Sequence, residues 1–217
     1  MPVVLCYGDS NTHGTVPLPA GAPRRRFDAE TRWPGVLASR LGPGWRVIEE
    51  GLPGRTTCLD DPLSQANRNG LATLAAILES HRPIDVVVLM LGTNDTKARF
   101  GMTAADIARG VEMLARTILS DRWDEGCGPD GGAPRLLVVA PPHCTLDGPF
   151  DRDEDGRTAR LSRALAPLLA DIVRSLGGEL LDAADVAEMS PIDGVHLDAD
   201  GHRALGEAIA TRIGERA

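Results

Sequence analysis

Residues 86–95 read VVVLMLGTND, and this stretch decides the fold. The six apolar residues Val86 to Leu91 are typical of a strand that is covered on both faces. Further short runs with strand character occur at Val3–Tyr7, Trp45–Glu49, Leu136–Ala140 and around Leu180–Leu181. Helical patterns lie between or after these runs, at Trp33–Leu41, Leu71–Ser80, Ala104–Leu119, Thr158–Leu176 and Gly201–Ile213. This alternation predicts an α/β fold, a three-layer α/β/α sandwich with a parallel five-stranded sheet.

Composition and charge exclude several classes of protein. The 217 residues, 42% of them apolar and 25% charged, fit a single domain over residues 1–217. The formal charge of −8 argues against nucleic acid or an anionic membrane as partner. No apolar run is long enough to span a membrane, and the first strand starts at once, so we expect a cytoplasmic protein. The four cysteines are widely spaced and form no CxxC pair, which predicts free thiols and no zinc site.

A polar or glycine-rich segment follows each predicted strand. In a parallel sheet these segments meet beyond the carboxyl ends of the strands, where functional loops lie. We therefore expect a serine, an asparagine, an aspartate and a histidine to gather at one edge. The segments are Gly8–Asn11, Glu50–Thr57, Gly92–Asp95, Pro141–His143 and Asp193–His196.

The turn after the first strand, Gly8-Asp9-Ser10-Asn11, has two interpretations. Asp9 and Ser10 are common helix caps, which gives a purely structural reading. Ser10 is alternatively a nucleophile at the carboxyl end of a central strand. A serine hydroxyl needs a neighbouring imidazole to take its proton, and His196 is the candidate base. Asp193, three residues earlier on the same loop, is placed to orient that imidazole.

Acyl transfer also requires donors for the negative charge that develops on the substrate oxygen. The candidates are the backbone N–H groups of Ser10 and Gly54 and the side-chain amide of Asn94. Gly54 suits this role because the missing Cβ lets the backbone approach a ligand closely.

These segments together resemble the SGNH hydrolases of the GDSL esterase/lipase superfamily. The matching blocks are Gly8-Asp9-Ser10, a glycine in Glu50–Thr57, Gly92-Thr93-Asn94-Asp95 and Asp193-Gly194-Val195-His196. Asn11 stands where the name-giving motif has leucine. Of the two glycines in the second block, similarity to the arylesterase/acyltransferase branch favours Gly54 over Gly51 as the donor.

The resemblance implies a flavodoxin-like fold and a serine esterase for short-chain aryl or alkyl esters. It implies catalytic roles for Ser10, Asp193 and His196, no metal and no cofactor, and a small ester as the substrate. The strings around Asp60-Asp61-Pro62 and Leu91–Lys97 resemble arylesterases that also transfer acyl groups to alcohols, and such relatives form homo-oligomers. A carbohydrate acetylesterase, or a thioesterase/lysophospholipase, remains an alternative on the same scaffold. A non-catalytic acyl- or glycan-binding protein is the alternative from another class.

Several residues have weaker indications. Asn11, His143 and Val195 are candidates for the substrate pocket, and the acidic loop Pro141–Gly156 is a candidate pocket wall that departs from an apolar channel. Residues 151–156 match half of a calcium loop, but its twelfth position is Ser162 rather than a glutamate, which favours a solvated loop. His13, His81 and His202 are expected in loops or on helix surfaces.

Overall fold

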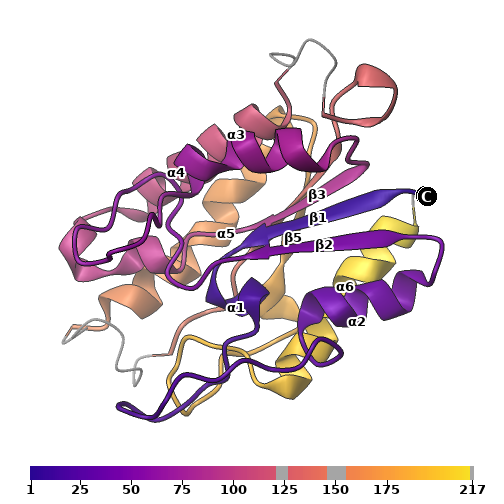
Figure 1. The fold of residues 1–217 in the computed structure, drawn as a ribbon. Helices are drawn as coiled ribbons and strands as arrows, with labels where there is room; N and C mark the ends of the chain where they lie inside the picture. Colours follow the sequence, from indigo (N-terminus) through magenta and orange to yellow (C-terminus); the bar gives the residue numbers. More distant parts are fainter. Residues whose placement is uncertain (121–126, 146–154, 216–217) are drawn as a thin grey trace.

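The computed structural model of the chain describes residues 1–120, 127–145 and 155–215. At its centre is a parallel sheet in the order β2-β1-β3-β4-β5 (Figure 1). The predicted parallel sheet of five strands is therefore confirmed. The strands are β1 (Val3–Gly8), β2 (Arg46–Gly51), β3 (Val86–Met90), β4 (Arg135–Ala140) and β5 (Glu179–Asp182).

Helices cover both faces of the sheet, which gives the expected three layers. Figure 1 shows α3, α4 and α5 on one face and α2 and α6 on the other. A short helix, α1, lies at the carboxyl end of β1. The bounds are α1 (Ser10–His13), α2 (Trp33–Leu41), α3 (Gly70–His81), α4 (Ala104–Ile118), α5 (Arg157–Ser175) and α6 (Ala199–Gly214).

The alternation of side chains along β1 builds two separate cores. Leu5 and Tyr7 belong to the core under α3, α4 and α5, whereas Val4 and Cys6 belong to the core under α2 and α6. Successive side chains of a strand point to opposite faces, so a strand covered on both sides has to be apolar throughout. This is the reason that β1 and β3 read as unbroken apolar runs.

The strand order puts the carboxyl end of β1 at a special position. The chain passes from β1 to β2 on one side of the sheet, then returns to β3 on the other side of β1. In open α/β sheets such a switch point leaves a crevice beyond the strand ends, where ligands bind. Ser10, two residues after the last residue of β1, stands at this crevice.

Most sequence-based boundaries agree with the structure within two residues, but α1 was not predicted. Its four residues are too few for a hydrophobic period to show in the sequence. The short 3-10 turns η1 (Asn94–Thr96) and η2 (Ala98–Phe100) were also missed. No helix within the described ranges is both long and apolar enough to cross a membrane.

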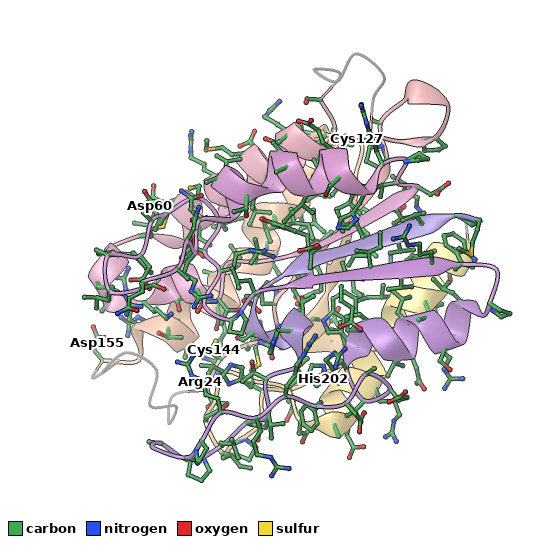
Figure 2. The ribbon with its side chains drawn as sticks, viewed as in Figure 1. Arg24, Asp60, Cys127, Cys144, Asp155 and His202 are labelled. Carbon is green, nitrogen blue, oxygen red and sulfur yellow. The ribbon has the colours of Figure 1, made fainter. Side chains whose placement is uncertain are left out.

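His202 is not on a helix surface as expected but fully buried in α6 (Figure 2). Its Nδ1 accepts a hydrogen bond from the backbone N–H of Trp33 at 3.3 Å, and its ring meets Phe27 edge-on with centroids 5.4 Å apart. Its Nε2 is buried with no partner among the described residues. Burial is the main cause that lowers the pKa of His202 to about 4.

We expect His202 to make the fold acid-sensitive. The unfolded chain binds a proton at this histidine near pH 6.5, whereas the native state binds it only near pH 4. The contribution of neutral His202 to the free energy of unfolding is therefore complete above pH 6.5. It is lost as the pH falls towards 4, by about 3 kcal/mol in total. Urea unfolding of wild type and His202→Gln across this range measures it. The free energy of unfolding should fall less steeply in the variant, and parallel pH curves would contradict the assignment.

Candidate active site

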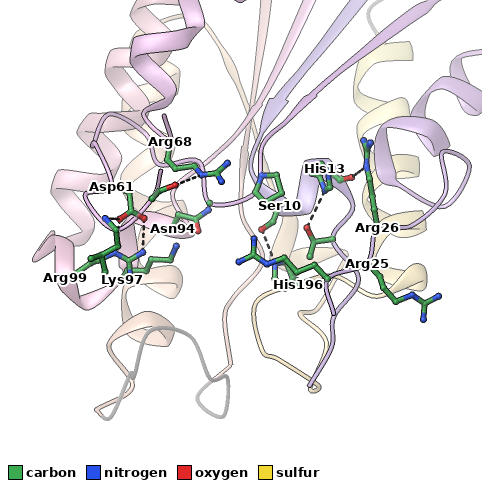
Figure 3. A pocket seen from close by; sticks show the side chains of 16 residues that line it. Ser10, His13, Arg25, Arg26, Asp61, Arg68, Asn94, Lys97, Arg99 and His196 are labelled. Atoms are coloured by element: carbon green, nitrogen blue, oxygen red, sulfur yellow. Dashed lines mark hydrogen bonds and ion pairs between the residues drawn. The ribbon is translucent and has the colours of Figure 1, made fainter. Parts of the chain in front are cut away.

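The structure brings together three of the predicted site residues from the two ends of the chain. Ser10 opens α1, and Asp193 and His196 lie on the loop that precedes α6 (Figure 3). The Ser10 hydroxyl is 3.0 Å from Nε2 of His196, and Nδ1 of His196 is 2.8 Å from Oδ2 of Asp193. This geometry fits an Nδ1–H that donates to Asp193, so that Nε2 accepts from the hydroxyl.

The carboxylate of Asp193 is held in its charged form. Its Oδ1 accepts hydrogen bonds from the backbone N–H groups of Val195 at 3.1 Å and His196 at 3.0 Å. Burial raises the pKa of Asp193, but the hydrogen bond and charge of His196 and these two donors outweigh it, so the pKa lies below the usual value. A charged carboxylate at this position stabilises an imidazolium when the ring takes up a proton.

Close backbone contact places α1 directly over the strand ends. A Cβ on Gly51, the last residue of β2, would lie 2.2 Å from the backbone nitrogen of His13. Only glycine at position 51 therefore allows α1 to lie in direct contact with the end of β2. Asp9 caps the turn by accepting the backbone N–H of Asn11 at 2.9 Å. The capping interpretation thus applies to Asp9, and Ser10 is left with its hydroxyl towards His196.

Three groups proposed as oxyanion donors lie around the same crevice. Gly54 has a φ of +82°, which a residue with a Cβ rarely adopts. The backbone N–H groups of Ser10 and Gly54 donate to no acceptor among the described residues. The amide of Asn94 donates to the Arg55 carbonyl at 3.1 Å, and its contact with Asp9 is long for a hydrogen bond at 3.4 Å, so the N–H directed at Asp9 is only weakly bound.

A cavity of about 470 Å³ opens beside Ser10, within the usual size range of small-molecule sites. Its lining includes Ser10, Gly54, Asn94 and His196 (Figure 3). The serine, the imidazole and the candidate donors thus share one space. A nucleophile, a base with its orienting carboxylate, and preorganised N–H groups in one cavity are the set that acyl transfer needs.

Comparisons with known proteins agree with this chemistry. The model of the GDSL-like Lipase/Acylhydrolase family matches residues 6–204. The chain belongs to this family. A carbohydrate acetylesterase from Sinorhizobium meliloti shares 39% identity and a TM-score of 0.90, with 99% of each chain covered. The aryl esterase of M. smegmatis shares 36% identity and a TM-score of 0.89, with 100% of each chain covered.

A comparison with curated proteins found no match. The match to the family model and the solved structures confirms three expectations: the resemblance, the fold, and a carboxylic ester hydrolase that uses a serine.

The three residues expected in the substrate pocket lie elsewhere in this GDSL-family structure. Asn11 and Val195 are buried, and neither lines the Ser10 cavity. Asn11 instead holds the histidine loop: its amide donates to the Val195 carbonyl at 3.0 Å, and its Oδ1 accepts the backbone N–H of Leu197 at 2.9 Å. His143 lines a second cavity, together with Arg163 and Glu188. The spacing of residues in the sequence does not predict these contacts, because they depend on which strand ends become neighbours.

Part of the loop Pro141–Gly156 falls outside the described residues. The half calcium loop at 151–156 is described only at Asp155 and Gly156, where Asp155 is exposed and lies 3.6 Å from Arg160. Among the residues that are described, no cluster of three or more histidine, cysteine or acidic side chains could hold a metal ion.

Arg55 is a buried arginine beside the site, with only 4% of its surface exposed. Its guanidinium donates to the Gly8 carbonyl at 2.9 Å and to the Glu50 carbonyl, and stacks 4.1 Å above the ring centroid of Tyr7. An arginine between two turn-forming segments carries no sequence signal for burial.

Replacing Asn11 by alanine should loosen the loop that carries His196. The variant leaves the buried Val195 carbonyl and Leu197 N–H without partners, which costs about 1–3 kcal/mol in unfolding free energy. We also expect a lower kcat for 4-nitrophenyl acetate, because the imidazole is no longer fixed against Ser10. Urea unfolding and steady-state kinetics measure the two effects.

The matched control for this variant is Thr103→Ala. Thr103 caps α4 through a capping box with Asp106, so its loss should cost about 1 kcal/mol without touching the histidine loop. If both variants lose kcat to the same extent, the effect of Asn11 is general destabilisation and not positioning.

Proposed function

We propose that this protein hydrolyses short-chain carboxylic esters through an acyl-enzyme formed on Ser10. The observation that carries the proposal is the continuous chain of contacts from the Ser10 hydroxyl through His196 to Asp193, at 3.0 and 2.8 Å, of which Ser10 and His196 line the cavity. The size of the cavity, about 470 Å³, suits a small acyl group and a small leaving group.

The reaction proceeds in two halves. Ser10 Oγ attacks the ester carbonyl carbon while Nε2 of His196 takes the hydroxyl proton, and Asp193 stabilises the imidazolium. The C–O bond to the alcohol then breaks, and Nε2 gives its proton to the leaving oxygen. Water attacks the acyl-serine, loses a proton to Nε2, and the carboxylic acid leaves as the proton returns to Ser10.

In both halves the former carbonyl oxygen carries negative charge. The N–H groups of Ser10 and Gly54 and the amide of Asn94 are proposed to receive it. Donors fixed in advance are effective because they need no reorganisation when the charge appears.

The nature of the ester has two candidates. An aryl or simple alkyl ester is one, and the description of the S. meliloti neighbour as a carbohydrate acetylesterase favours an acetylated sugar as the other. A thioester or lysophospholipid remains the more distant alternative. Turnover of a 4-nitrophenyl ester series from acetate to palmitate, set against acetate release from acetylated xylose, separates these groups.

Three finer expectations belong to the same proposal. The likeness to the arylesterase/acyltransferase branch supports transfer of the acyl group to alcohols beside hydrolysis. It also supports a homo-oligomer in which neighbouring subunits wall the site. A cytoplasmic location rests on the sequence expectation alone.

The triad is tested by removing its members one at a time. Ser10→Ala should abolish covalent labelling by a fluorophosphonate, because the attacking oxygen is gone. His196→Ala should lower kcat for 4-nitrophenyl acetate by about 10³-fold or more, and Asp193→Ala by less, since water can replace part of its orienting role. Mass spectrometry of the labelled protein measures the loss of labelling, and steady-state kinetics measures the loss of kcat. If Ser10→Ala hydrolysed 4-nitrophenyl acetate at the rate of the wild-type protein, the proposal would be wrong.

Asn94→Ala tests the proposed oxyanion site. Its amide acts mainly once negative charge has developed, so we expect kcat to fall by about 10²–10³-fold with little change in KM. Asn94→Asp should lose at least as much, because a carboxylate repels the oxyanion. Steady-state kinetics with 4-nitrophenyl acetate decides this. An unchanged kcat in Asn94→Ala would remove this residue from the reaction.

A further inference from the structure

The cavity beside Ser10 has a charge opposite to that of the whole protein. The chain carries 23 basic and 31 acidic residues, for a formal charge of −8. Among the described residues that line the cavity, six are nevertheless cationic and one, Asp61, is acidic. The cations are Arg24, Arg25, Arg26, Arg68, Lys97 and Arg99, and Lys97 is the only lysine of the chain.

Arg26 and Arg99 pair with carboxylates of the described residues. Arg26 lies 3.2 Å from Glu49, and Arg99 lies 2.9 Å from Asp61. For Arg24, Arg25 and Arg68, no carboxylate within the described part of the chain lies at ion-pair distance. Several like charges that converge on one cavity repel each other, and an anion placed among them relieves this repulsion.

Arg68 is held beside the proposed oxyanion site. Its carbonyl accepts the backbone N–H of Thr56 at 2.9 Å, and its Nε donates to Oγ of Ser64 at 3.0 Å. The side chain passes over Gly54: a Cβ there would lie 3.6 Å from Cδ and 3.7 Å from Nε of Arg68. The Nη groups of Arg68 have no partner among the described residues, so they are available to a ligand in the cavity.

Arg25 and Arg24 approach from the other side, on the loop of residues 15–26. The base of this loop is closed by hydrogen bonds from Val16 N–H to the Arg25 carbonyl at 3.0 Å and from Phe27 N–H to the Gly14 carbonyl at 2.8 Å. Figure 3 shows Arg68 on the side of Asn94 and Arg25 on the side of His196, with Ser10 between them. Arginines from two separate segments therefore line the cavity on two sides of Ser10.

From this arrangement, and resting on the esterase function proposed above, we propose that the cavity selects esters with a negatively charged group away from the reacting carbonyl. The group is a carboxylate, a sulfate or a phosphate. Arginine is suited to hold it because the planar guanidinium presents paired N–H donors to two oxygens of an oxyanion. Cations that line a cleft also raise the encounter rate of anionic substrates, by about 10-fold to 10³-fold at low ionic strength.

The experiment compares acetate esters that differ in the charge of the leaving group. 4-Acetoxybenzoate and 4-acetoxyphenyl phosphate are the anionic substrates, and 4-acetoxybenzamide is the neutral analogue of the first. All three give the same acetyl-enzyme, and each rate is divided by the rate of hydroxide-catalysed hydrolysis to correct for reactivity. At about 20 mM NaCl we expect kcat/KM to favour the anionic esters by about tenfold or more, and at about 0.5 M NaCl the preference should shrink.

Variants locate the effect. Arg68→Gln, which removes one positive charge from the cavity, and the double variant Arg24→Gln/Arg25→Gln, which removes two, should each lower the ratio of anionic to neutral kcat/KM by about threefold or more. The matched control is Arg174→Gln, which removes the same charge at the far end of α5, where Arg174 is exposed and pairs with Asp171. The ratio should not change in this control. If Arg68→Gln fails to fold, the double variant on the exposed loop still decides the matter.

The outcomes separate this inference from the function on which it rests. Equal turnover of neutral and anionic esters at low salt overturns the anion preference but leaves the esterase standing. A preference that survives in both cavity variants overturns the assignment to these arginines. Response of only the benzoate or only the phosphate ester identifies which oxyanion the cavity accepts. If wild type turns over none of the esters and Ser10 is not labelled by a fluorophosphonate, the esterase proposal itself fails.

Discussion

The contact on which the site depends most is the pair of hydrogen bonds made by Asn11. Its amide and carbonyl bind the backbone of Val195 and Leu197, across more than 180 residues of chain. These bonds fix the first turn after β1 against the loop before α6. The Ser10 hydroxyl and the His196 imidazole are therefore held 3.0 Å apart by the backbone that carries them. Both bonds are buried, and a buried backbone group is costly to leave unpaired, so the arrangement resists slippage. Positioning of this kind supplies much of what a proton transfer from serine requires.

A second buried network fixes the proposed donors relative to each other. Asp95 accepts the hydroxyl of Thr57 at 2.6 Å and its N–H at 3.0 Å, which ties the loop that carries Gly54 to the turn that carries Asn94. Burial raises the pKa of Asp95 to about 6, with the Thr57 hydrogen bonds opposing the shift. Directed hydrogen bonds to the buried carboxyl of Asp95 thus hold the two segments in one relative geometry.

The sequence predicted the layers of the fold well, because a covered strand such as β3 has to be apolar on both faces and therefore stands out. It also predicted which residues follow each strand, so the meeting of Ser10, Asp193 and His196 could be expected from the parallel topology. It could not predict that Asn11 braces a distant loop, that His202 is buried, or that Arg55 lies over Tyr7. Each of these depends on side-chain contacts between segments far apart in sequence, and polar residues carry no periodic signal for burial.

Net charge and local charge lead to different conclusions about partners. The value of −8 disfavours a nucleic acid or an anionic membrane, since such polyanions contact a broad surface and meet the average charge of the protein. A small ester enters one cavity, and at physiological salt it responds mainly to charges within about 8 Å. There it meets, within the described part of the chain, six cationic side chains, five of them arginines from three separate segments. Repulsion of large anions and the proposed attraction of a small one are therefore compatible in one chain, because these arginines are concentrated in the cavity beside Ser10.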